Sequence, residues 1–162
     1  MKKILFCLAI VFTTSTAIAS KPIQLSLTPD IALHGRNETI EGLTLSIWGE
    51  NLQKALSLGI VNGSNGQSVG LSLGLLNYAD GYRGIHWGGV NYTKNSFFGL
   101  QLGYVNWAEH MNGVQFGLLN YAETAQTGVQ IGLVNIIAQN KKWFGNFPNE
   151  VAPGMLLVNW RF

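Results

Sequence analysis

The sequence predicts an all-β fold, and the main expectation is a small antiparallel transmembrane β-barrel of about 8–10 strands. Three observations favour it. A short phrase repeats through the middle of the chain, apolar residues alternate along each copy, and the chain ends on an alternating strand with an aromatic last residue. Hydrophobic residues make up 47% of the chain and charged residues 11%, yet after the leader no run of about 18 apolar residues could form a membrane helix. The apolar residues are instead distributed over strands.

The repeated phrase runs from Ala55 to Ile137, and the copy from Gly113 to Asn120 (GVQFGLLN) is typical of it. Six copies end on an asparagine, and successive asparagines are 15, 14, 15, 14 and 15 residues apart. A fixed period of this kind marks repeated supersecondary units. A weaker copy lies at residues 42–48. The repeat-defining positions are Gly70, Gly74, Asn77, Gly84, Gly88, Asn91, Gly99, Gly103, Asn106, Gly113, Gly117, Asn120, Gly128, Gly132 and Asn135.

Each copy is predicted to be a strand followed by a turn, because successive side chains of a strand point to opposite faces. In the copy at residues 113–122, Gln115 shares one face with glycines, while Phe116, Leu118 and Asn120 share the other. In a barrel the glycine and glutamine face would line the lumen, and the apolar face would meet lipid. An asparagine on the lipid side is tolerable only near the membrane interface, where polar groups cost little.

A parallel β-solenoid can use the same repeat, with each copy forming one coil and the six asparagines stacking as a ladder. Three features favour the barrel instead. The spacing alternates between 14 and 15, as expected for a two-strand unit. Residues 70–79 have the length of a tilted membrane strand, about 10 residues. The terminal Phe162 has no role in a solenoid.

The leader is expected to be a secretory signal peptide, residues 1–19. Lys2 and Lys3 precede a short apolar core, and small residues from Ala17 to Ala19 form a cleavage signal. The single cysteine, Cys7, would leave with it, which removes disulfide and thiolate-metal chemistry. Residues 20–162 are then one repeat-built domain, with repeats at about 42–137 and a terminal strand at 153–162. The expected location is the bacterial outer membrane or cell surface.

The predicted terminal strand also favours an outer-membrane barrel. Leu156, Val158, Trp160 and Phe162 share one face, and the last residue is aromatic. A strand of this form resembles the assembly signal of outer-membrane barrels, so outer-membrane lipid and the barrel-assembly machinery are the expected partners.

The glycine, glutamine and asparagine phrase resembles that of a family of small bacterial surface-repeat proteins, whose biochemical role is not established. The segment at Ile23–Leu27 and the weaker copy at residues 42–48 resemble the family's N-terminal pattern. The resemblance covers nearly all of the chain after the leader. It implies an exported, surface or outer-membrane location, and it carries over no catalytic residue.

No constellation of residues predicts catalysis, a cofactor or a metal. His86 occupies the glutamine position of its copy, while His34 and His110 lie in turns and have no ligand spacing. Removing Lys2 and Lys3 from the ten basic residues leaves eight, against eight acidic residues, so nothing favours nucleic acid.

The predicted function is therefore a small structural or surface-interaction barrel without catalysis. A secreted solenoid adhesin is one alternative. Another is an outer-membrane lipid-modifying enzyme that uses His34 or His86 with a strand serine. The run Lys141-Lys142-Trp143-Phe144 lies in the longest irregular stretch, where it could bind a partner or anchor at a membrane interface. The surface partner itself is not predicted.

Overall fold

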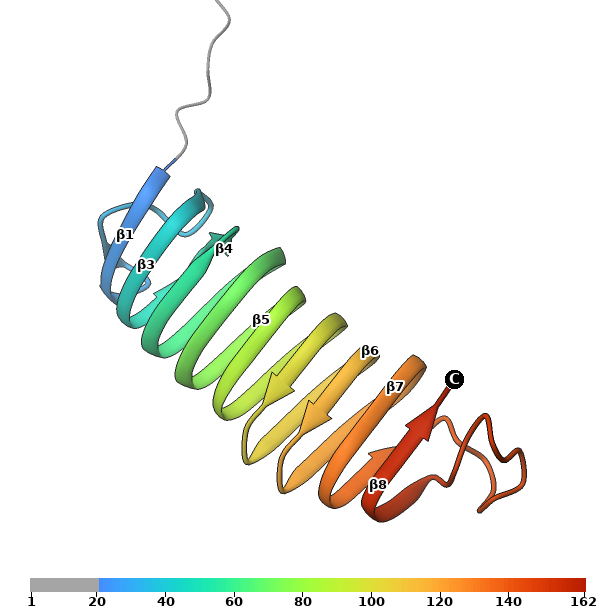
Figure 1. Ribbon diagram of the computed structural model, residues 1–162. Helices are drawn as coiled ribbons and strands as arrows, with labels where there is room; N and C mark the ends of the chain where they lie inside the picture. Colours follow the sequence, from blue (N-terminus) through green and yellow to red (C-terminus); the bar gives the residue numbers. More distant parts are fainter. Residues whose placement is uncertain (1–20) are drawn as a thin grey trace, which may run out of the picture.

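The computed structural model describes residues 21–162, which wind into a parallel β-solenoid (Figure 1). Successive coils stack along one axis, from β1 (Lys21–Thr28) at one end to β8 (Gly154–Arg161) at the other. Neighbouring strands follow the order β2-β1-β3-β5-β6-β7-β8, with β4 paired to β3. The intervening strands are β2 (Ile31–Ala32), β3 (Thr39–Glu50), β4 (Leu52–Gln53), β5 (Leu56–Leu102), β6 (Val105–Phe116) and β7 (Leu119–Ile137).

Each repeat of the sequence is one coil. The β5·β6 and β6·β7 pairs are parallel and place Asn91 beside Asn106 and Asn106 beside Asn120. The 14- and 15-residue spacings alternate because irregularities between Thr93 and Ser96, and between Met111 and Gly113, each let one strand hold an extra residue. The backbone keeps strand geometry through several successive coils, so β5 is 47 residues long.

The barrel expectation is wrong, and the alternative of a parallel solenoid is confirmed. A barrel needs antiparallel hairpins between consecutive copies, whereas these copies run in the same direction. The physical reason is that buried amides are satisfied when the same residue lies directly above and below, which parallel in-register stacking provides. The turn at Lys94–Ser96 consequently stacks on the turn near His110 along one edge of the solenoid.

The predicted division into faces is also wrong. Gln115 and Asn120 were expected on opposite faces, yet both are buried, while Phe116 is 54% exposed. A bend at Gly117 breaks the strand, and Leu118 and the residue after it both point outward. The alternation therefore shifts by one residue at the bend. Polar side chains fill the interior and apolar side chains cover much of the outside.

The interior is apolar only beside the turn edge. A cluster of buried residues fills that side, while glutamine, serine and asparagine side chains fill the other. The cluster consists of Ala79, Tyr82, Phe97, Ala108, Met111, Ala122, Ala125 and Ile137. Four of its members are alanines and the other four are large side chains.

Antiparallel strands close both ends of the solenoid. At one end β2 pairs with β1, and at the other β8 pairs with β7, where Val129 lies beside Trp160. Such strands interrupt the parallel stacking, so the ends do not offer a template for further coils. Within residues 21–162 no helix is long and apolar enough to cross a membrane. The predicted signal peptide, with Cys7, lies outside the described residues.

Candidate functional site

The asparagines form a continuous ladder inside the solenoid. Asn91 Nδ2 donates to Asn106 Oδ1 at 2.8 Å and to the backbone oxygen of Leu102 at 2.9 Å. The same pair of bonds recurs at the preceding and following coils. A carbonyl oxygen can only accept a hydrogen bond, so it fixes which amide atom is nitrogen. These asparagines stabilise the fold and are not available to a ligand.

A second ladder is made by the buried glutamines. Gln115 Nε2 donates to Gln101 Oε1 at 2.7 Å, and Gln130 Nε2 donates to Gln115 Oε1 at 2.8 Å. Each Nε2 also donates to a backbone oxygen, as Gln130 does to Ile136 at 2.9 Å. Two rows of mutually bonded amides therefore use most of the polar groups that the repeat carries. Any binding surface must lie outside.

The outer surface carries an apolar groove with a volume of about 1120 Å³. It follows the bend in successive coils, and none of its lining residues is charged. Tyr104 and Leu75, on its rim, are each 69% exposed, and Trp87 is 60% exposed. The lining comprises Leu73, Gly74, Leu75, Trp87, Gly88, Gly89, Leu102, Gly103, Tyr104, Phe116, Gly117, Leu118, Ile131, Gly132, Leu133, Leu157 and Val158.

Glycine at the bend is required by the stacking. A Cβ on Gly117 would lie 2.0 Å from the Gly103 carbonyl oxygen and 2.6 Å from Asn106 Nδ2. The same conflict occurs at Gly88 and Gly132. An added side chain would point at the neighbouring coil and the buried asparagines, so these glycines allow the coils to approach and the asparagine ladder to form. The apolar residues on either side of them point outward and line the groove.

An aromatic row lies on the outer face next to the groove. Tyr92, Trp107 and Tyr121 are in register, and the rings of Trp107 and Tyr121 are stacked with centroids 4.0 Å apart. The row continues to Tyr78, whose hydroxyl accepts a hydrogen bond from Trp48 Nε1 at 3.1 Å. Burial raises the pKa of Tyr78. Trp107 stacks on Tyr121 and lies 6.5 Å from Tyr92, so these rings stabilise adjacent coils.

His86 is the one buried titratable group in the glutamine row. Its ring packs on Tyr82 at 3.9 Å and near Phe97 at 5.7 Å. Burial lowers its pKa to about 3, so the imidazole is neutral at physiological pH. Within residues 21–162, neither His86 Nδ1 nor the Tyr82 hydroxyl has a hydrogen-bond partner. Enclosed among rings, His86 cannot reach a substrate from this position.

The other two histidines lie elsewhere. His34 is 3.5 Å from Glu38 near the N-terminal end, and His110 Nδ1 is 2.7 Å from the Thr124 hydroxyl on the exposed turn edge. The structure therefore does not bring the three histidines together. In the part of the chain that the structure describes, no group of three or more His, Cys, Asp or Glu residues could hold a metal ion.

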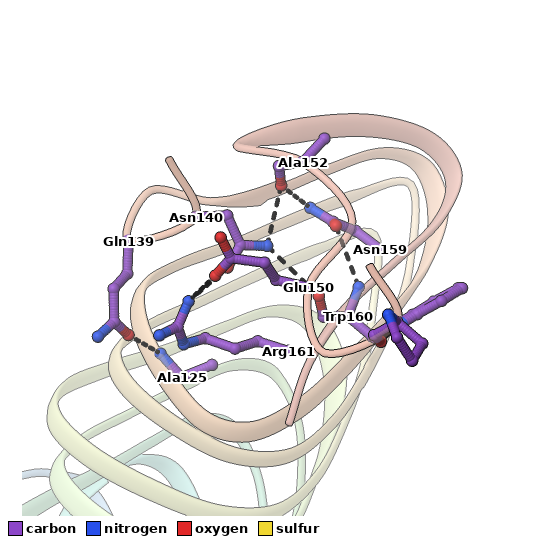
Figure 2. A network of polar contacts seen from close by, with 9 residues as sticks. Ala125, Gln139, Asn140, Glu150, Ala152, Asn159, Trp160 and Arg161 are labelled. Atoms are coloured by element: carbon purple, nitrogen blue, oxygen red, sulfur yellow. Dashed lines mark hydrogen bonds and ion pairs between the residues drawn. The ribbon is translucent and has the colours of Figure 1, made fainter. Parts of the chain in front are cut away.

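The C-terminal end carries a network of polar contacts, drawn in Figure 2. Glu150 and Arg161 form a largely buried ion pair, and Arg161 also donates to Asn140 Oδ1 at 3.2 Å. Asn140 and Asn159 donate to the same backbone oxygen, that of Ala152, at 3.0 and 2.9 Å. This network fixes the base of the loop at residues 139–152, which is called the cap loop below.

The four residues predicted as an assembly signal lie in or directly after β8. Leu156 and Phe162 are exposed by 69% and 62%, Val158 lines the groove, and Trp160 is half-buried against the cap loop. β8 closes the solenoid by pairing antiparallel with β7, and the assembly signal stays a prediction. The groove was not predicted from the sequence, although apolar residues on both sides of the repeat glycines are a usable signal for it.

Comparison with protein-family models, with curated proteins and with solved structures found no match for this chain. The class that the geometry defines is an all-β parallel solenoid with an apolar outer groove.

Proposed function

We propose that the mature protein is an exported, non-catalytic β-solenoid that binds a partner at the bacterial cell surface through the apolar groove. The observation that carries the proposal is the uninterrupted, uncharged lining of that groove across successive coils. Monomeric soluble proteins rarely expose a large contiguous apolar patch unless it binds something. Export and a surface or outer-membrane location are proposed from the leader pattern and the family resemblance.

The alternative of a lipid-modifying enzyme has less support. It would use His34 or His86 with a serine, but His86 is 1% exposed and its neighbours are the rings of Tyr82 and Phe97. His34 lies at the N-terminal end and contacts Glu38. A nucleophile and its base must be within hydrogen-bond reach of each other and of the substrate. A binding role needs only the exposed apolar surface.

The proposal is tested with fluorescently labelled protein comprising residues 21–162, titrated onto washed bacterial cells and measured by flow cytometry. The groove variant Phe116→Ser/Leu118→Ser removes two outward side chains that flank Gly117. We expect about a 10-fold weaker apparent affinity, because truncation of a few apolar anchors commonly accounts for most of an interface energy.

The matched control is Glu123→Gln, an exposed change on the opposite, turn edge of the same coil. It is expected to bind as the unmodified protein does. Far-UV circular dichroism verifies that all three proteins are folded. Equal cell binding by the groove variant and the control would refute the groove as the binding surface.

A further inference from the structure

The cap loop holds large aromatic side chains in water. Trp143, Phe144 and Phe147 are exposed by 63%, 54% and 58%. Their rings form a chain of contacts, with centroids 6.5 Å apart between Trp143 and Phe144 and 6.4 Å apart between Phe144 and Phe147. Phe147 then packs on Trp160 at 6.0 Å. Side chains of this size normally lie in a core or an interface, because water solvates them poorly.

The fold keeps this cluster exposed. Beneath it lies the buried network of Figure 2, and Trp160 Nε1 donates to the Pro148 carbonyl oxygen at 2.8 Å. Phe144 N donates to the Val151 carbonyl oxygen at 2.7 Å, and Phe144 has φ of 55°, in the left-handed region. A non-glycine residue persists in that region only where its surroundings hold it. The cap loop therefore presents its aromatic rings as an organised surface.

The charge beside the rings is positive. Lys141 and Lys142 are exposed, and among residues 21–162 neither takes part in an ion pair. The single acidic residue of the cap loop, Glu150, is 7% exposed and paired with Arg161. Among its side chains, the loop therefore offers two positive charges outside any ion pair and no exposed negative charge.

We propose that the cap loop docks the protein on an anionic lipid surface. Trp143, Phe144 and Phe147 lie at the level of the headgroups, where aromatic rings are favoured, and Lys141 and Lys142 contact the lipid phosphates. Insertion of apolar side chains and attraction of basic side chains to lipid each give only weak membrane binding, and stable attachment needs both. The inference goes beyond the proposed groove function, because the cap loop is a separate surface at the end of the solenoid (Figure 1).

Charge complementarity favours lipid over a second copy of this chain. A copy would have to supply an acidic apolar surface, but the groove lining is uncharged and the cap loop itself repels another cap loop. An anionic bilayer supplies both the negative charge and the partly apolar interface. Self-association through the cap loop is the competing outcome that the test distinguishes.

The test is flotation of protein residues 21–162 with vesicles of phosphatidylcholine alone and of phosphatidylcholine mixed with phosphatidylglycerol, at low and high salt. Binding is expected to the mixed vesicles and to weaken with salt. Lys141→Gln/Lys142→Gln is expected to lower partitioning about 25-fold, at roughly fivefold for each lysine. Trp143→Ser/Phe144→Ser is expected to lower it at both salt concentrations.

Two controls separate this inference from the groove function. Lys54→Gln/Lys94→Gln removes the same charge from the coils and is expected to retain most of the binding. Phe116→Ser/Leu118→Ser alters the groove and is also expected to retain it. Equal binding to both vesicle types, or unchanged binding by the two cap-loop variants, would overturn the proposal. Self-association is measured by sedimentation without vesicles. The proposal would also be overturned if the unmodified protein self-associated without binding vesicles and Trp143→Ser/Phe144→Ser abolished that self-association.

Discussion

At the scale of single residues, the buried asparagines show why a polar interior can be stable. Asn106 makes side-chain hydrogen bonds to two asparagines, in the coils before and after it, and to the backbone of Phe116. A buried polar group is costly only when it lacks a partner, and here each amide is the partner of the next. Repetition of one residue type therefore solves the problem that a single buried asparagine would create.

Replacement of Asn106 by alanine is expected to lower the free energy of unfolding by about 2–4 kcal/mol, because it removes these bonds and leaves Asn91 Nδ2 and Asn120 Oδ1 without their ladder partners. The matched control is Asn112→Ala, which alters a partly exposed asparagine of the same coil and should change stability by less than about 0.5 kcal/mol. Urea unfolding followed by circular dichroism measures both. Similar unfolding midpoints for the two variants would contradict the role of the ladder.

His86 predicts how stability depends on pH. Its folded pKa of about 3 lies below the ordinary value of 6.5, so the unfolded state binds more protons between these two pH values. This contribution to stability is fully present above pH 6.5 and is lost as the pH falls toward 3. We expect a loss of about 2 kcal/mol between pH 7.5 and 5.

The variant His86→Gln is expected to remove that loss, because glutamine already occupies the equivalent place at Gln101 and Gln115 and does not titrate. His110→Gln, which removes an exposed imidazole, is the control and should keep the original pH dependence. The measurement is the free energy of unfolding in urea at the two pH values. An unchanged slope in His86→Gln would show that another group is responsible.

At the scale of elements, glycine positions decide whether coils can approach each other. Gly113 has φ of 139°, and a Cβ there would lie 2.0 Å from the Gly99 carbonyl oxygen. Gly113→Ala should therefore destabilise the protein by about 2–4 kcal/mol or prevent folding, through backbone strain and steric conflict together. Gly154→Ala is the control, because nothing lies within 4 Å of its added Cβ. Thermal unfolding of the two variants should separate them by well over 5 °C.

Strand content and repeat boundaries could be predicted from the sequence, because glycine and β-branched residues at a fixed period have few other solutions. The direction of the strands could not. Period-2 alternation on either side of Gly117 is equally compatible with a hairpin or a coil, and the bend that moves Phe116 and Leu118 outward leaves no signal in alternation alone. The groove was not predicted because its apolar side chains, such as Phe116 and Leu118, were assigned to a lipid-facing barrel surface and Gly117 to the lumen.

At the scale of the whole molecule, the solenoid is a stack of equivalent units, so a complete coil should be removable. Deletion of residues 99–112 joins Phe98 to Gly113, which lies beside Gly99 in the sheet, and keeps both ladders in register. The shortened protein is expected to fold with a long axis reduced by about 4.8 Å. Small-angle X-ray scattering and circular dichroism test this.

Deletion of residues 99–105 is the control for this experiment. It removes half a coil, so the asparagine row would face the wrong side chains and the protein should fail to fold. If both deletions unfold, or if both fold equally well, the coils are not equivalent units.

The opposite directions of the two ladders have an electrical consequence. Asparagine Nδ2 atoms donate toward the C-terminal end, as from Asn106 to Asn120, whereas glutamine Nε2 atoms donate toward the N-terminal end, as from Gln130 to Gln115. Each row of aligned amides is a chain of dipoles, like the peptide units of a helix, and antiparallel chains cancel. Where Ser72 and His86 replace glutamine, the asparagine dipoles have no opposing row. The N-terminal half of the solenoid therefore carries a lengthwise polarisation that the C-terminal half lacks.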